Sequence, residues 1–140
     1  MKRIAPLAAA LASSLAACAT TPAALDMVTV TGEATYRERI ALPPEAVMTV
    51  RIEDVSRADA PAPALAEESY TADGRQVPLA FAVEVPRAAL EGAVNTSARV
   101  RIEDADGRLM WTTDTHTQVT PVAGEDRIDL GTLVMVRTPG

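Results

Sequence analysis

The sequence contains very few of the residues that support metal binding, redox chemistry or disulfide cross-links. Its 140 residues include one cysteine, one histidine, one tryptophan, one phenylalanine and two tyrosines. A single cysteine cannot form an intramolecular disulfide, so packing alone must hold the fold together. The methionines of the expected strands, Met27, Met48, Met110 and Met135, are too scattered for a copper site. We therefore expect no metal and no cofactor.

Basic charge and long apolar runs are scarce as well. Lys and Arg number 13 against 19 Asp and Glu, which gives a formal net charge of −6. An acidic surface suits neither nucleic acid nor electrostatic attachment to anionic lipid. A membrane-spanning helix needs roughly 20 consecutive apolar residues, and the only apolar run, near the N-terminus, is shorter. Membrane attachment, if there is any, must have another basis.

The most informative stretch lies where this N-terminal apolar run ends. A basic start is followed by an Ala/Leu-rich segment that finishes with Leu15, Ala16 and Ala17 before Cys18. This arrangement fits the lipobox of bacterial lipoproteins. It predicts that residues 1–17 are a signal peptide and that Cys18 is lipidated on its thiol and its new amine. The alternative is an ordinary secretory signal, cleaved near an Ala-x-Ala sequence, with an incidental cysteine.

Removal of this leader leaves 123 residues, enough for one hydrophobic core. Because Lys2 and Arg3 leave with it, the formal charge changes from −6 to −8. Residues 18–26 are expected to form the lipidated cysteine and a short tether, and residues 27–140 a single domain. Ala19 follows the cysteine where an Asp would favour retention in the inner membrane, so we expect an outer-membrane protein that faces the periplasm.

The expected domain alternates apolar and polar residues, which predicts strands. Turn-forming sequences separate the alternating stretches, and one helical turn is expected over residues 86–92. The last strand has a predicted bulge at Gly131. The expected fold is all-β: a single antiparallel, immunoglobulin-like β-sandwich of about seven to eight strands, with Phe81 and Trp111 as core anchors. The expected strands cover residues 27–36, 46–53, 65–71, 77–85, 98–102, 108–117 and 128–137.

The sequence Val-Arg-Ile-Glu-Asp occurs twice, at residues 50–54 and 100–104. Each copy ends an alternating stretch and precedes a loop. We interpret the two copies as equivalent strands that each end in an acidic turn. Duplication of half the domain and coincidence both remain open as explanations.

Candidate chemistry is sparse. His116 is the only histidine, Asp114 lies two residues before it, and Ser69 or Ser97 is a conceivable nucleophile, but no spacing sets the geometry that a catalytic triad needs. Residues 104–107 resemble the start of a calcium loop, whose continuation fails at Arg108 and Thr115. We therefore predict that the protein is not an enzyme.

A charged cluster precedes the double proline at residues 43–44. It consists of Arg37, Glu38 and Arg39 and follows Tyr36. Two arginines within reach of each other bind carboxylates well, and the alternative is that the cluster forms ion pairs on a solvated surface. These four residues are the candidate partner surface.

Three stretches stand out together: Val30-Thr31-Gly32 leading to Thr35-Tyr36-Arg37-Glu38-Arg39-Ile40-Ala41-Leu42-Pro43-Pro44, then Ile52 to Pro61, and Asp104 to Thr115. These stretches resemble those of YbaY/YscW-type lipoproteins. The resemblance implies a β-sandwich, often lipid-anchored, with no catalytic residues. One branch of that family comprises type III secretion pilotins, which guide secretin subunits to the outer membrane by binding a short secretin tail. The matches here are strongest to the broader YbaY branch.

The leading hypothesis is a non-enzymatic binding or assembly module, held at the outer membrane by the lipid on Cys18, with a protein partner in the envelope. The partner segment is expected along an edge strand or as a helix in an apolar groove. A pilotin-like or chaperone-like role for an outer-membrane protein is the specific form of this hypothesis. The alternative is an envelope protein that binds a small ligand or a metal ion.

Overall fold

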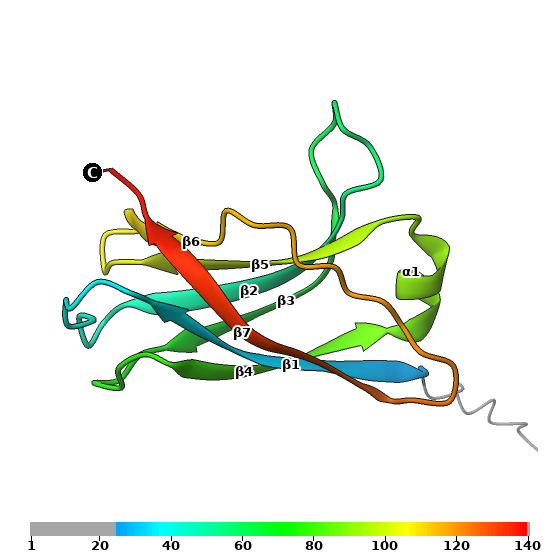
Figure 1. Cartoon of the computed structure of the whole chain (residues 1–140), viewed down its shortest axis with the longest axis horizontal. Coiled ribbons are helices and arrows are strands. Elements are labelled where there is room, and N and C mark those ends of the chain that lie inside the picture. The colour runs from blue at the N-terminus through cyan, green and yellow to red at the C-terminus, as the bar shows by residue number, and fades with distance from the viewer. Residues whose placement is uncertain (1–24, 140) are drawn as a thin grey trace, which may run out of the picture.

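A computed structural model describes residues 25–139, and β-strands form most of the secondary structure in that range. Figure 1 shows the strands curving around one another, with the short helix α1 at one end. No helix in the described range is both long and apolar enough to cross a membrane. The elements are β1 (Met27–Tyr36), β2 (Val47–Asp54), β3 (Ala64–Thr71), β4 (Leu79–Pro86), α1 (Arg87–Gly92), β5 (Thr96–Glu103), β6 (Leu109–Thr112) and β7 (Arg127–Arg137).

The seven strands form one mixed sheet in the order β3-β2-β5-β6-β7-β1-β4. The prediction of a mainly β fold is confirmed, but the antiparallel immunoglobulin-like sandwich is corrected to a single sheet that curls into a nearly closed barrel. Neighbouring strands are antiparallel except β1 and β7, which run parallel. The two edge strands, β3 and β4, approach each other where the barrel would close.

The parallel pair follows from the path of the chain between β6 and β7. Residues 113–126 travel back to the end of the barrel where β1 begins, and there the amide of Thr29 donates a hydrogen bond to the carbonyl of Asp126, at 2.8 Å. Strand β7 therefore starts at the same end as β1 and runs in the same direction (Figure 1).

The hydrophobic core forms from the apolar side chains on one face of the alternating strands. In β4 the buried and exposed residues alternate without interruption, with Leu79, Phe81, Val83 and Val85 buried. The ring of Phe81 packs so closely beneath β1 that a Cβ at Gly32 would lie 2.8 Å from Phe81 Cζ. Burial of each large apolar side chain contributes about 1.5–3 kcal/mol.

The repeated Val-Arg-Ile-Glu-Asp occupies two neighbouring antiparallel strands, β2 and β5. Val50 lies directly opposite Val100 in the register, so the two copies are related by a local twofold arrangement about that pair. Each copy ends in a turn in which the aspartate accepts from the backbone amide two residues ahead: Asp54 from Ser56 at 3.0 Å and Asp104 from Asp106 at 2.9 Å.

The strand expected over residues 108–117 is shorter in the structure. Strand β6 ends at Thr112, and the following residues run along β5 through scattered hydrogen bonds, such as that from the Ala98 amide to the Thr117 carbonyl at 2.9 Å. The bulge expected in the last strand is present: the β1–β7 register shifts between Thr31 and Glu33, and Gly131 has φ 69°. Glycine adopts this left-handed conformation without the steric cost of a Cβ.

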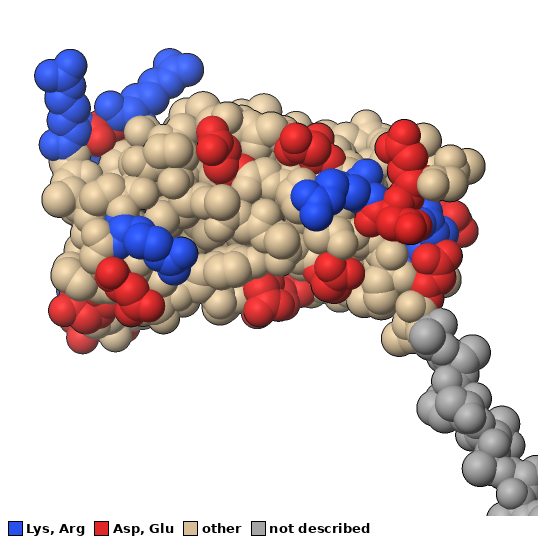
Figure 2. All heavy atoms as spheres, turned by 90° about the horizontal axis from the view of Figure 1, so that it is seen from below, with Lys and Arg blue, Asp and Glu red and all other residues tan. Residues whose placement is uncertain are grey.

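Arg87 links the start of β1 to the loop before β7. Its guanidinium lies 2.8 Å from both Asp26 and Asp126 and donates to the Glu125 carbonyl at 2.9 Å. Figure 2 shows acidic side chains gathered over this end of the molecule, whereas basic side chains project from the opposite end. The first described residues are therefore held at one defined end of the barrel.

Candidate functional site

The four residues of the predicted partner surface occupy two different environments. Tyr36 lies in the core, where its ring stacks on Trp111 with centroids 4.1 Å apart, and its hydroxyl donates to the Ile40 carbonyl at 2.8 Å. Burial, reinforced by the negative charge of Glu38, raises the pKa of Tyr36. The accessible part of the predicted surface is therefore limited to Arg37, Glu38 and Arg39. Phe81 and Trp111, the predicted core anchors, are both buried.

Glu38 borders a hollow at the end of the barrel where β1 and β7 finish. The hollow has a volume of about 320 Å³. Glu38 Oε2 is buried and accepts no hydrogen bond within residues 25–139. A buried acceptor without a donor carries a desolvation penalty that a bound N–H group would remove. The hollow is lined by Arg37, Glu38, Asp114, Thr115, Val134, Met135 and Val136.

A second hollow continues from the first along β7. It measures about 220 Å³ and shares Thr115 and Val134 with the first hollow. We call the two together the β7 groove. Val134 and Val136 present apolar side chains here, and each is more than a third exposed. The second hollow is lined by Thr113, Thr115, Thr117, Thr132, Leu133 and Val134.

The groove exists because β7 lacks a strand partner along most of one side. Strand β7 pairs with β1 over almost its whole length, but β6 reaches only Val136 and Arg137. Within the described range, no backbone hydrogen bond joins β7 to residues 113–118. The Thr138 amide donates to the Met110 carbonyl on the β6 side. Because backbone groups alternate in direction along a strand, those of Val134 and Thr132 face the groove.

The other edge of the sheet is bridged by a side chain. The Tyr70 hydroxyl on β3 donates to the Ala82 carbonyl on β4 at 2.6 Å and accepts from the Ala82 amide at 3.1 Å. An apolar hollow beside this bridge is lined by Glu68, Tyr70, Ala80, Phe81 and Ala82. Glu68 is exposed at this edge, and a charge on an edge strand hinders the addition of further strands. At the β3–β4 seam the backbone groups of Ala82 are thus hydrogen-bonded and the edge carries a charge. On the groove side of β7, by contrast, the described part of the chain offers no backbone partner to residues 132 and 134.

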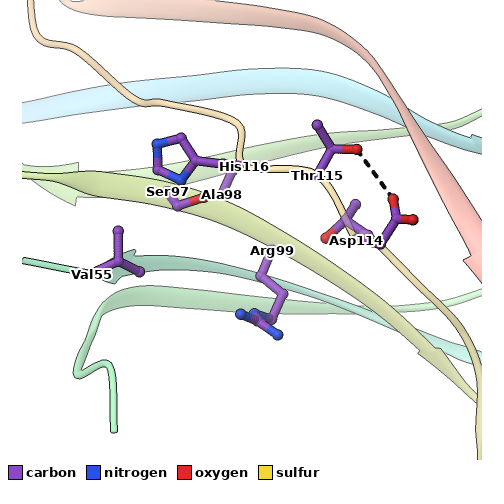
Figure 3. A pocket seen from close by; sticks show the side chains of 8 residues that line it. Val55, Ser97, Ala98, Arg99, Asp114, Thr115 and His116 are labelled. Carbon is purple, nitrogen blue, oxygen red and sulfur yellow. Dashed lines mark hydrogen bonds between the residues drawn. The ribbon is translucent and has the colours of Figure 1, made fainter. Parts of the chain in front are cut away.

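His116 lies beside a polar hollow of about 290 Å³, shown in Figure 3. The hollow brings together His116, Ser97 and Asp114, which are the residue types of a catalytic triad. However, Asp114 accepts from the Thr115 hydroxyl at 3.1 Å, Ser97 Oγ accepts from the Thr117 amide at 3.3 Å, and no hydrogen bond joins His116 to either residue. In Figure 3 the imidazole and the Asp114 carboxylate lie apart. A triad needs these groups in hydrogen-bond contact.

The calcium-loop resemblance at residues 104–107 corresponds to a hairpin turn. Asp104 Oδ1 accepts from the backbone amides of Asp106 and Arg108, both at 2.9 Å, so this oxygen is committed to the turn. No group of three or more His, Cys, Asp or Glu side chains in the described range is placed to hold a metal ion. Cys18 and the lipobox residues Leu15, Ala16 and Ala17 lie outside the described residues.

Residues 25–131 match the protein family described as "Type III secretion system lipoprotein chaperone (YscW)". The chain belongs to the YscW family. It is 35% identical over 130 residues to the protein named "Uncharacterized lipoprotein YbaY" from Escherichia coli (strain K12). The match covers 90% of this chain and 65% of that relative's length.

A solved structure has the same fold. It is the structure of an alternative pilotin from the type II secretion system of Vibrio cholerae, which superimposes with a TM-score of 0.66 and 39% sequence identity. The match covers 80% of this chain and 99% of that one. The family is thus described as one of lipoprotein chaperones, and the solved structure as a pilotin.

The β7 groove was not predicted from the sequence. Residues 108–117 alternate as a strand does, so the sequence predicted one continuous strand, although only residues 109–112 form a strand of the sheet. A usable signal was present in residues 130–136, where apolar side chains occupy both faces of the strand. A strand that is apolar on both faces is typically covered on both faces, and Val134 and Val136 are not.

Proposed function

We propose that this protein is an outer-membrane lipoprotein whose periplasmic barrel binds a segment of an envelope protein and so acts as a pilotin-like chaperone. The observation that carries the proposal is the 39% identity to a type II secretion pilotin over 99% of that pilotin's chain. The YscW family match supports the same class of function. In this proposal the partner is an outer-membrane protein of a secretion or assembly system, and no reaction is catalysed.

The proposed anchor is the lipid on Cys18. Residues 1–17 are the signal peptide, residues 18–26 are the lipidated cysteine and tether, and residues 27–140 are the binding domain. Each buried CH₂ group of an acyl chain contributes about 0.8 kcal/mol to membrane binding, so several chains hold the protein firmly. Ala19 favours the outer membrane. Arg87 supports a defined exit for the tether, because it holds Asp26 against the barrel end.

Tethering is the proposed mechanism. A binding domain confined near the membrane meets membrane-proximal partners at a raised effective concentration, without any additional contact. A partner segment bound to the barrel would be carried with the lipid anchor to the outer membrane. An exposed strand edge and adjoining hollows are the features through which folded domains commonly bind extended segments.

The lipid anchor is tested by labelled palmitate incorporation in cells that express the wild-type protein or Cys18→Ala. We expect label in the wild type and none in Cys18→Ala. Equal label in both proteins would refute lipidation of Cys18. Fractionation of the same cells tests the location, with the wild type expected in the outer-membrane fraction.

The binding function is tested by chemical crosslinking in whole envelopes, followed by purification of the lipidated protein. We expect an outer-membrane secretin or assembly protein to be retained by the wild type, with less recovered from Cys18→Ala. If no protein is specifically retained, the chaperone proposal fails and the alternative of a small-ligand carrier takes its place, with the hollow at His116 as the site to examine.

A further inference from the structure

We propose that the β7 groove takes an extended peptide segment, which adds as a strand beside β7 and places a lysine or arginine side chain against Glu38. This inference rests on the proposed function, because it assigns the site and the chemistry of the bound segment. The β3–β4 seam is the competing location on the same molecule.

The backbone of β7 supplies the first requirement for strand addition. Val134 and Thr132 direct their amide and carbonyl groups into the groove, where the described part of the chain offers them no backbone partner. An extended peptide presents donors and acceptors in the same alternating pattern and satisfies both groups at once. The β4 edge differs, because the Tyr70 hydroxyl already occupies the amide and carbonyl of Ala82.

The side chains along the groove indicate what such a segment carries. Val134 and Val136 are exposed on β7, while the opposite wall is rich in threonine. Threonine and β-branched apolar residues pair well across neighbouring strands. A segment that alternates small polar and branched apolar residues fits these two walls.

Glu38 indicates which charge the bound peptide segment carries at one end of the groove. Its Oε2 atom is buried without a hydrogen-bond donor. None of the ion pairs within the described range includes Glu38, Asp114 or the exposed Arg37. Two carboxylates and the guanidinium of Arg37 therefore line this end of the groove, and one of the carboxylates has an unsatisfied buried oxygen. A lysine or arginine on the segment supplies the missing donor through a charge-assisted hydrogen bond.

The test uses the full-length lipidated protein in detergent micelles and a synthetic probe. The probe is a fluorescent nonapeptide of alternating valine and threonine with one terminal arginine. Two matched probes carry glutamate in place of the arginine, or N-methyl groups on the amides of one edge. Binding is measured by fluorescence anisotropy, and the bound location by hydrogen exchange of backbone amides.

We expect the arginine probe to bind and to slow exchange at Val134 and Thr132, and the N-methylated probe not to bind. Glu38→Gln should weaken binding of the arginine probe about tenfold, which is the loss of one charge-assisted bond, whereas the matched Glu91→Gln on α1 should leave it unchanged. Val134→Pro, which removes one groove-facing amide, should also weaken binding. If Val134→Pro fails to fold, Glu38→Gln remains a complete test.

Three results would overturn the inference: no protection at Val134 and Thr132, equal affinity of wild type and Glu38→Gln, or protection at the β4 edge in place of β7. None of these results bears on the proposed function, which stands or falls on the partner recovered from envelopes. Conversely, a β7 groove that binds the probe, together with envelopes that yield no partner, would leave the groove established and the chaperone role refuted.

Discussion

The ring of Tyr36 lies flat against the indole of Trp111, with centroids 4.1 Å apart and ring planes 7° from parallel. The pair joins the end of β1 to β6, two strands that are separated by β7 in the sheet. The sequence has four Phe, Trp and Tyr residues in all, and two of them form this one contact. Tyr36 directly precedes Arg37 and Glu38, which line one end of the β7 groove.

The first prediction concerns this stack. Tyr36→Ala should lower the free energy of unfolding by about 3–5 kcal/mol, because it leaves a cavity beside the indole. Tyr36→Phe keeps the ring and loses only the hydroxyl bond to the Ile40 carbonyl, so a loss of about 0.5–1.5 kcal/mol is expected. Urea unfolding followed by the fluorescence of Trp111 measures both. Equal losses in the two variants would show that ring packing contributes little.

The second prediction concerns alkaline pH. The folded-state pKa of Tyr36 lies above the ordinary 10.0, chiefly because of burial. The contribution of the neutral phenol to stability is therefore fully present below the ordinary pKa of 10.0. It is lost as the pH rises through the folded-state pKa. Unfolding midpoints measured between about pH 8 and about pH 11 should fall more steeply for the wild type than for Tyr36→Phe. Parallel curves would contradict the prediction.

The third prediction concerns the close approach at Gly32. A Cβ at this position would lie 2.8 Å from Phe81 Cζ and 2.9 Å from the Gly131 carbonyl oxygen, and the backbone oxygen cannot move aside easily. Gly32→Ala should therefore destabilise the protein by about 1–3 kcal/mol. Gly92→Ala is the matched control, because nothing lies within 4 Å of its Cβ position. Thermal unfolding compares the two, and a similar midpoint for both would contradict the packing argument.

The fourth prediction concerns closure of the barrel. Tyr70→Phe removes both hydrogen bonds to Ala82, and we expect a loss of about 0.5–1.5 kcal/mol in stability. The Ala82 amide should exchange faster with solvent, while the neighbouring Val83, which pairs with Val30 in β1, should remain protected. Unchanged exchange at Ala82 would mean that another group covers the β4 edge.

Much of the local structure follows from the order of residues alone. The alternation in residues 77–85 predicted both the strand and its buried side, because side chains point to opposite faces at successive positions. The bulge at Gly131 was visible as a shift in the apolar phase and is present. The two copies of Val-Arg-Ile-Glu-Asp end in the same kind of aspartate turn, as their sequence indicates.

The candidate site was less predictable. The sequence placed Tyr36 in one surface cluster with Arg37, Glu38 and Arg39, because adjacent residues share a neighbourhood in the chain. The side chain of the last residue in a strand, however, can point into the core while that of the next residue points to solvent. Tyr36 is buried and Arg37 is exposed in this way. The groove residues Thr115 and Val134 are far apart in the chain, so no local pattern brings them together.

Residue order and composition are enough to predict a mainly β domain without an intramolecular disulfide, because alternation and a single cysteine can be read directly from the sequence. The arrangement of the strands depends on contacts between parts of the chain that are distant in the sequence. The parallel pairing of β1 with β7, the single curled sheet and the free edge of β7 all depend on where residues 113–126 lead the chain. Alternation specifies which face of a strand is buried, but it is the same for a sandwich and a barrel, because both bury one face of each strand. The choice of neighbour is made by long-range packing, which alternation does not encode.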